Sequence, residues 1–161
     1  MFAEQDDVHF PCDLPRRCAA RLLLCDADER VLLLRHEPPL HVLHWAGPGG
    51  GLDAGESPEQ ALRRELTEEL ALAGELALEP AGEWRHVFRY HGVVVVQHEL
   101  LYRAQLPEGV APESVLLGPQ ANEDGISGLR WWTPADLQEA TEDVWPEGLA
   151  TWAARGLRGR R

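Results

Sequence analysis

The chain has 161 residues, about the length of one domain, and its 44% hydrophobic and 26% charged content is typical of globular proteins. Its formal net charge of −12 argues against duplex nucleic acid as a partner, because a duplex-binding surface is basic. No apolar run approaches the about 20 residues of a membrane span, and the acidic N-terminus lacks the order of a signal peptide, so we expect neither membrane insertion nor export.

The N-terminal part of the chain predicts an extended arm followed by a β-hairpin. Residues 1–15 are polar and contain two prolines, which favours an arm. Arg17–Cys25 and Arg30–Arg35 are apolar runs, and Asp26–Glu29 between them is a turn-like polar stretch. Two apolar runs joined by such a stretch are typical of a hairpin.

The cysteines predict a reducing compartment. The chain has three, Cys12, Cys18 and Cys25, with no C-x-x-C pair. An odd number without that motif disfavours a disulfide framework, so we predict a cytoplasmic protein. Cys18 and Cys25 lie in an apolar run, and we expect both to be buried, unreactive thiols.

A helix is predicted after a glycine-rich loop. Gly47–Gly51 is a backbone-flexible loop. Ser57 is a suitable N-cap, Pro58 suits the first helical position, and Gln60 completes a capping box. The helix is expected to extend from Pro58 to about Leu72, and further towards Gly74 if nothing stops it.

The second half of the chain predicts two long strands, a functional loop, a last strand and short helices, within one domain covering residues 1–161. The mixture of strands and helices without strict alternation favours a mixed sheet flanked by helices, of the α/β class. The expected elements are strands at Gly82–Tyr90 and Gly92–Ala104, a loop at Pro107–Asp124, a strand at Ile126–Trp132, helices to about Ala140 and over Pro146–Ala154, and a solvated basic tail at 155–161.

Three glutamates in the predicted helix lie on one edge of its apolar face. At about 100° per residue, Glu65, Glu68 and Glu69 form a stripe directly beside a stripe of leucines. Like charges at this spacing repel, and more strongly near an apolar wall. A divalent cation would remove the repulsion, and a cluster of oxygen ligands favours a hard ion, Mg²⁺ or Mn²⁺.

The segment from Gly50 to Leu72 resembles the Nudix box, G-x5-E-x7-R-E-U-x-E-E-x-G-U, where U is a bulky aliphatic residue. Every specified position matches except one, since Ala71 stands where the pattern has its last glycine. The matching charged and glycine positions are Gly50, Glu56, Arg64, Glu65, Glu68 and Glu69. The flanking hairpin, the Trp45–Gly51 entry and Leu129–Trp132 also resemble the family.

This resemblance implies a fold and an activity. The family fold is an α/β/α sandwich with a mixed β-sheet. Its members hydrolyse nucleoside diphosphates linked to another moiety, by water attack at phosphorus with Mg²⁺ or Mn²⁺. We therefore expect a small, nucleotide-like diphosphate substrate. The particular derivative and the oligomeric state stay open.

The resemblance also implies roles for individual residues. Glu65, Glu68 and Glu69 would bind the metal, with the carbonyl of Gly49 as a further ligand. Either Glu65 or Glu68 could instead act as the base. The remaining matched residues would support the site: Arg64 orients the carboxylates, Glu56 pairs with Arg64, and Gly50 allows close approach.

A base outside the box is expected in the loop before the last strand. Glu123 is the first candidate and Asp124 the second, while Glu99 is a weaker one. His41 and His44 lie in a Pro-flanked loop without a third soft ligand, which favours substrate contact or exposure over metal binding.

Two aspects of the substrate site and activity stay open. Trp84, Phe88 and Tyr90 could stack on a base, although core packing is expected for most of them. The main alternative activity is a non-catalytic Nudix-fold binding module, and an isomerase of the same fold is a second. A non-catalytic module would be expected to lose box carboxylates, and this chain keeps them all.

Overall fold

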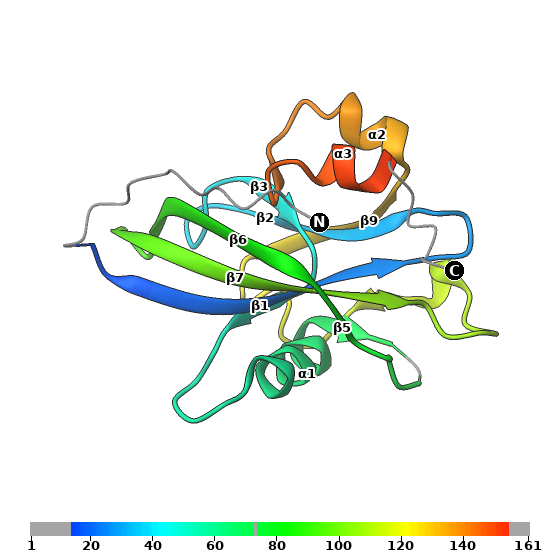
Figure 1. Cartoon of the computed structure of the whole chain (residues 1–161), viewed down its shortest axis with the longest axis horizontal. Coiled ribbons are helices and arrows are strands. Elements are labelled where there is room, and N and C mark those ends of the chain that lie inside the picture. The colour runs from blue at the N-terminus through cyan, green and yellow to red at the C-terminus, as the bar shows by residue number, and fades with distance from the viewer. Residues whose placement is uncertain (1–13, 73, 155–161) are drawn as a thin grey trace.

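A long mixed β-sheet forms the centre of the protein (Figure 1). The computed structural model describes residues 14–72 and 74–154. In the main sheet the strands follow the order β10-β3-β2-β1-β7-β6, with β4 added to β1 and β9 added to β2, while β5 and β8 form a separate pair. The elements are β1 Arg16–Cys25, β2 Val31–His36, β3 His44–Ala46, β4 Gly49–Gly51, α1 Pro58–Glu69, β5 Leu70–Ala71, β6 Glu79–Tyr90, β7 Val93–Gln105, a 3₁₀ turn Pro112–Ser114, β8 Leu116–Leu117, β9 Ile126–Trp132, α2 Pro134–Gln138, β10 Val144–Trp145 and α3 Leu149–Ala154.

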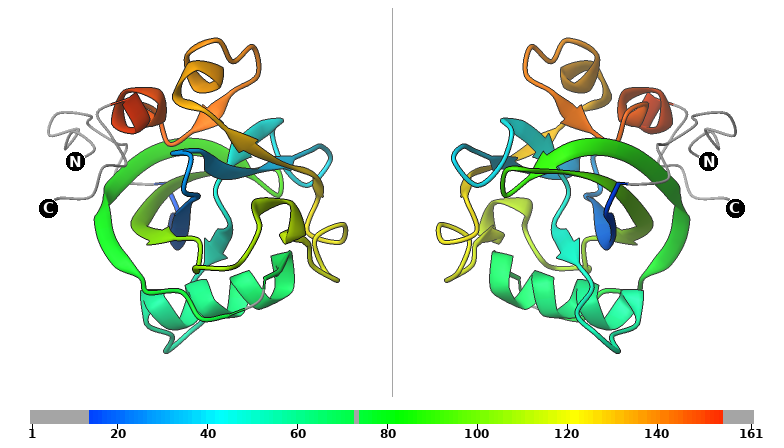
Figure 2. Two further views of the ribbon diagram at one scale, coloured as in Figure 1. Left: turned by 90° about the vertical axis from the view of Figure 1, so that its right-hand side faces the viewer. Right: turned by 90° about the vertical axis from the view of Figure 1, so that its left-hand side faces the viewer.

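Helices cover both faces of the sheet, with α1 on one side and α2 and α3 on the other (Figures 1 and 2). The alternation of side chains along β1 and β2 explains this arrangement. Leu22 and Leu24 pack with Leu62 of α1, whereas Leu23 packs with Leu137 and other residues of the opposite layer. Apolar strands buried on both faces are typical of such a sandwich. The predicted α/β class and mixed sheet are confirmed.

Both predicted strand connections are present. Asp26 accepts hydrogen bonds from the amides of Asp28 and Arg30 at 3.0 and 2.8 Å, and Cys25 pairs with Val31 across the turn. Strands β6 and β7 meet at His91 and Gly92, which have φ values of 46° and 80°. This positive-φ pair suits a tight hairpin between twisted strands. The pairing of β1 with β2 is confined to Cys25, however, and on its other edge β1 pairs in parallel with β7 along its whole length.

Several expectations need correction. Helix α1 ends at Glu69 rather than near Leu72, because the next two residues, Leu70 and Ala71, pair with β8 as a short strand. The glycine loop contains β4, which pairs with β1. Cys18 is exposed, although Cys25 is buried and its pKa is raised to about 12 by burial.

The remaining boundaries agree closely or lie outside the described residues. Strand β9 has the predicted bounds, while α2 and α3 are shorter than expected. Most of the predicted arm and all of the basic tail fall outside the described residues, as does Cys12. Among the helices of the described ranges, none is long and apolar enough to cross a membrane.

Candidate active site

Helix α1 begins with the predicted capping box. The Ser57 hydroxyl accepts a hydrogen bond from the Gln60 amide at 3.1 Å, and the Gln60 side chain accepts one from the Ser57 amide at 2.9 Å. Pro58 follows at the start of the helix. These bonds satisfy amides that the first turn would leave unpaired. The helix start thus sets which residues of α1 face the sheet.

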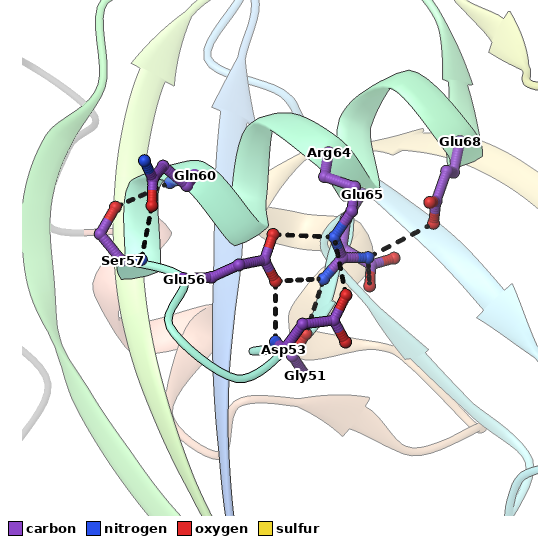
Figure 3. A network of polar contacts seen from close by, with 8 residues as sticks. All are labelled: Gly51, Asp53, Glu56, Ser57, Gln60, Arg64, Glu65 and Glu68. Carbon is purple, nitrogen blue, oxygen red and sulfur yellow. Dashed lines mark hydrogen bonds and ion pairs between the residues drawn. The ribbon is translucent and has the colours of Figure 1, made fainter.

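Arg64 is the centre of a network of carboxylates along α1 (Figure 3). Its guanidinium donates two bonds to Glu56, at 2.9 and 2.8 Å, and one to Glu65 at 2.9 Å. It also donates to the Gly51 carbonyl at 3.0 Å and lies 3.6 Å from a Glu68 oxygen. The ion pair between Glu56 and Arg64 is therefore present as expected. The hydrogen bonds from Arg64 lower the pKa of Glu56 to about 2.

Two glycines allow the chain to pass close to the α1 carboxylates. A Cβ atom on Gly50 would lie 2.6 Å from a Glu65 carboxylate oxygen, so any larger residue would displace Glu65. The Gly49 amide donates to Glu69 at 3.0 Å. Gly50 thus lets Glu65 lie directly against the backbone, while Gly49 lets β4 pass close to the backbone of β1 and donates its amide to Glu69.

A loop after β8, residues 118–125, brings an additional carboxylate to α1. Its amides at Gly118 and Gln120 donate to the carbonyls of Glu69 and Glu68, at 2.6 and 3.2 Å. These bonds give partners to two carbonyl groups in the last turn of α1, which the helix itself leaves unpaired. The family pattern has a glycine shortly after this point, where this chain has Ala71. The same loop places Asp124 with Glu65 and Glu68, so that one oxygen from each lies within 4.8 Å of the others. We call these three residues the acidic group and residues 118–125 the acidic loop.

Burial raises the pKa of several of these carboxyls. Glu69 is 3% exposed, and burial together with the charge of Glu65 raises its pKa to about 8. Burial also raises the pKa of Glu65, against the opposing effect of Arg64. The pKa of Asp124 is raised by burial and by the neighbouring Glu123. Burial and mutual repulsion disfavour the charged form of these carboxyls, and such clusters are typical of a site that binds a cation.

A cavity of about 290 Å³ opens beside the acidic group. The carboxylates of Glu65, Glu68, Glu69 and Asp124 line it and form what we call the carboxylate wall, and Glu123 also lines the cavity. The rings of Phe88, Tyr90, His44 and Trp145 line the cavity as well, and we call them the aromatic wall. Trp84 is buried in the core on the α2 and α3 side, as expected. Phe88 and Tyr90 are half-buried and line the cavity, so the expected core packing of most of these three aromatics was wrong.

His41 and His44 line the cavity, and burial lowers the pKa of both rings. His44 stacks on Trp145 with ring centres 3.7 Å apart, and burial lowers its pKa to about 3. His41 donates from Nε2 to the Asp124 carbonyl at 2.6 Å. Both rings line the cavity, as the prediction of substrate contact allows. In the described part of the chain, the groups able to hold a metal include no histidine.

Glu99, the weaker candidate for the base, is buried and is not among the residues that line the cavity. It is 1% exposed and accepts hydrogen bonds from Arg21 at 2.9 Å and from Gln97 at 2.7 Å. Arg21 itself lines the cavity and donates to the Gly47 carbonyl at 2.8 Å. The sequence interpretation missed this pair, although a charged residue inside the apolar run of β1 was a visible signal.

The fold and the site together define an α/β protein with carboxylates of one helix facing a cavity. A family model described as NUDIX domain matches residues 15–153. This chain belongs to the Nudix family.

Known proteins similar to the chain agree with this assignment. The chain is 35% identical over 126 residues to a protein named RNA pyrophosphohydrolase from Hahella chejuensis, covering 70% of this chain and 74% of that protein. A second RNA pyrophosphohydrolase, from Gluconacetobacter diazotrophicus, is 36% identical over 78 residues, which is about half the length of each protein. The chain is thus an enzyme of the Nudix pyrophosphohydrolase class.

Solved structures show the same fold. A MutT NUDIX hydrolase from Burkholderia pseudomallei has a TM-score of 0.62 at 22% identity, covering 86% of this chain and 97% of that one. An Ap4A hydrolase from C. elegans has a TM-score of 0.56 at 22% identity, covering 86% of this chain and 96% of that one. At this identity the likeness concerns the fold alone.

Proposed function

We propose that the chain hydrolyses a diphosphate linkage in a small nucleotide-like substrate with the help of Mg²⁺ or Mn²⁺. The observation that carries this proposal is the acidic group, three carboxylates with oxygens within 4.8 Å of one another on the wall of a cavity. A donor set made of carboxylate oxygens suits a hard divalent cation. A polyanionic substrate would be repelled by these residues without such a cation.

The residues of α1 and the acidic loop have different roles in this proposal. Glu65, Glu68 and Asp124 would hold the cation, with the Gly49 carbonyl as a further ligand. Glu69, which the resemblance implied as a ligand, lines the same cavity but does not belong to the acidic group. When bound, the ion would neutralise the diphosphate and lower the pKa of a bound water molecule. Arg64 would keep Glu65 and Glu68 oriented through its bonds along the helix.

Glu123 is proposed as the general base. It is exposed and lines the cavity, whereas its neighbour Asp124 is half-buried and belongs to the acidic group. An exposed carboxylate keeps its freedom to approach a water molecule and accept its proton in the transition state. In this assignment Asp124 is a ligand rather than the base.

The aromatic wall supports a nucleotide-like substrate. Rings of Phe88, Tyr90 and Trp145 face the cavity, and aromatic side chains stack on nucleobases without strong dependence on the base. The name of the Hahella chejuensis relative, RNA pyrophosphohydrolase, suggests a 5′-phosphorylated RNA as one substrate for testing. The net charge of −12 favours a short substrate over a long polyanion.

The test is a substrate panel in ¹⁸O-labelled water. Nucleoside triphosphates, dinucleoside tetraphosphates and a short 5′-triphosphorylated RNA are incubated with Mg²⁺, Mn²⁺ or EDTA. We expect cleavage of at least one substrate with label on a single phosphorus, and no cleavage in EDTA. Turnover in rigorously metal-free enzyme would contradict the metal site. Tight nucleotide binding without any turnover would favour the non-catalytic alternative.

A further inference from the structure

The loop between β2 and β3, residues 37–43, is bonded to the C-terminal end of the acidic loop. Two hydrogen bonds join the loops. The Glu37 amide donates to the Gly125 carbonyl at 2.9 Å, and the His41 ring donates from Nε2 to the Asp124 carbonyl at 2.6 Å. His41 is thus bonded to the backbone of a residue whose carboxylate belongs to the acidic group.

The His41 ring packs tightly against the backbone of the acidic loop at Gly125. Gly125 has a φ of 76°, and a Cβ atom there would lie 2.9 Å from Cδ2 of the His41 ring. Only a residue without a side chain allows the ring to lie directly against this backbone. Pairing of His36 with Ile126 brings the ends of β2 and β9, and hence both loops, next to each other.

The two ends of the acidic loop are anchored differently. Gly118 and Gln120 bind the end of α1 through backbone amides, which any residue other than proline supplies. At the other end the backbone bond from Glu37 to Gly125 is joined by a side-chain bond from His41 to Asp124, which depends on the identity of residue 41. A substitution at His41 should therefore leave the fold and the helix end intact and release Asp124 locally.

We propose that His41 is a positioning residue, which holds the Asp124 carboxylate beside Glu65 and Glu68 through the Asp124 carbonyl. The proposal rests on the proposed function, since it takes the acidic group as the cation site. It concerns a residue outside the Nudix box, on a loop that reaches the site only in the folded chain. The imidazole acts as a fixed donor and takes no part in proton transfer.

The experiment measures Mn²⁺ binding to the full-length protein by titration calorimetry. His41→Leu should weaken binding about tenfold, as is typical when a residue that orients a ligand is removed. His41→Gln, whose amide can donate to the same carbonyl, should bind within about threefold of wild type. His98→Leu is the matched control, because His98 bonds to Glu83 on the surface and does not line the cavity.

A double-mutant cycle tests whether His41 acts through Asp124. If it does, His41→Leu combined with Asp124→Asn should bind Mn²⁺ no more weakly than Asp124→Asn alone. Losses that multiply in the double variant would overturn the proposal, as would His41→Leu binding like wild type or equal losses in His41→Leu and His41→Gln.

Amide hydrogen exchange separates this proposal from the proposed function. Without added metal, His41→Leu should exchange faster than wild type at Gly125 and Ile126, whereas His98→Leu should not. If wild type fails to bind Mn²⁺, the proposed function fails and exchange alone decides whether His41 positions the loop. Unchanged exchange at both amides would overturn the positioning role.

Discussion

The two walls of the cavity are built from different kinds of chain segment. Glu68 and Glu69 lie three and four residues after Glu65, so one turn of α1 brings both onto the same side of the helix as Glu65. The aromatic wall combines rings from β3, β6 and β10. Trp145 there lies 3.7 Å from His44 and 5.6 Å from Phe88, measured between ring centres.

This difference teaches which kind of change each wall should tolerate. A cation site requires oxygen atoms of a given charge at given positions. A stacking surface requires only a flat aromatic ring that can lie parallel to the base and in contact with it. Substitutions on the carboxylate wall should therefore affect rate, and those on the aromatic wall should affect affinity and substrate choice. The predictions below test this division, from the largest expected effect to the smallest.

Glu68→Gln should lower kcat/KM by about 10³-fold, because loss of one ligand removes several kcal/mol of transition-state stabilisation. Glu68 is half-buried, so the fold should persist, and high Mn²⁺ should restore part of the rate. Steady-state kinetics and thermal unfolding measure the two effects. Glu59→Gln, in the exposed first turn of the same helix, is the control. A folded Glu68→Gln enzyme within threefold of wild type would show that Glu68 is not a ligand.

Glu123→Gln should lower kcat by about 10²-fold, within the range of general-base catalysis, and leave KM and Mn²⁺ affinity nearly unchanged. Asp124→Asn should instead weaken Mn²⁺ binding, because its carboxylate belongs to the acidic group. Kinetics over a range of Mn²⁺ concentrations separate the two. If Asp124→Asn loses kcat at saturating Mn²⁺ while Glu123→Gln is normal, the assignments must be exchanged.

Tyr90→Leu should raise KM for a nucleotide substrate about tenfold with a smaller change in kcat, since one stacked base contributes about 1–3 kcal/mol. The KM for inorganic tripolyphosphate, which has no ring, should not change. Val87→Ala is the control, because Val87 lies on the same strand and is 43% exposed. Equal losses for both substrates would mean that the aromatic wall does not bind the base.

Glu69 should make the stability of the metal-free protein depend on pH. Burial raises its pKa from 4.5 to about 8, so the folded state keeps a proton that the unfolded chain releases. Between about pH 5 and pH 8, the contribution of Glu69 to the free energy of unfolding should therefore decrease as pH rises, by at most about 1.4 kcal/mol per pH unit. Urea unfolding in EDTA measures the slope. The same slope in Glu69→Gln would exclude Glu69 as its source.

Local signals in the sequence predicted the carboxylate wall well. The capping box at Ser57 and Gln60 set the start of α1, and the helical period placed Glu65, Glu68 and Glu69 on one edge. The bounds of β9 and both hairpin turns were also predicted. These features depend on bonds and periodicities that act within a few residues, and such signals are present in the sequence itself.

Contacts between distant segments were not predictable in the same way. The end of α1 at Glu69 depends on the pairing of Leu70 with Leu117 in β8, and the burial of Glu99 depends on Arg21 of β1. Asp124 was only the second candidate for the base, and its association with Glu65 and Glu68 requires the acidic loop to fold back onto α1.

The sequence by itself thus determined the helix, its carboxylates and the family to which the chain belongs. The tertiary structure decided which residues complete the site: Asp124 beside the carboxylates, His41 against the loop, and the rings of the aromatic wall. The reason is physical. Helix caps and periodicity act between near neighbours in the chain, whereas the site is completed where the sheet and its burial bring remote segments into contact.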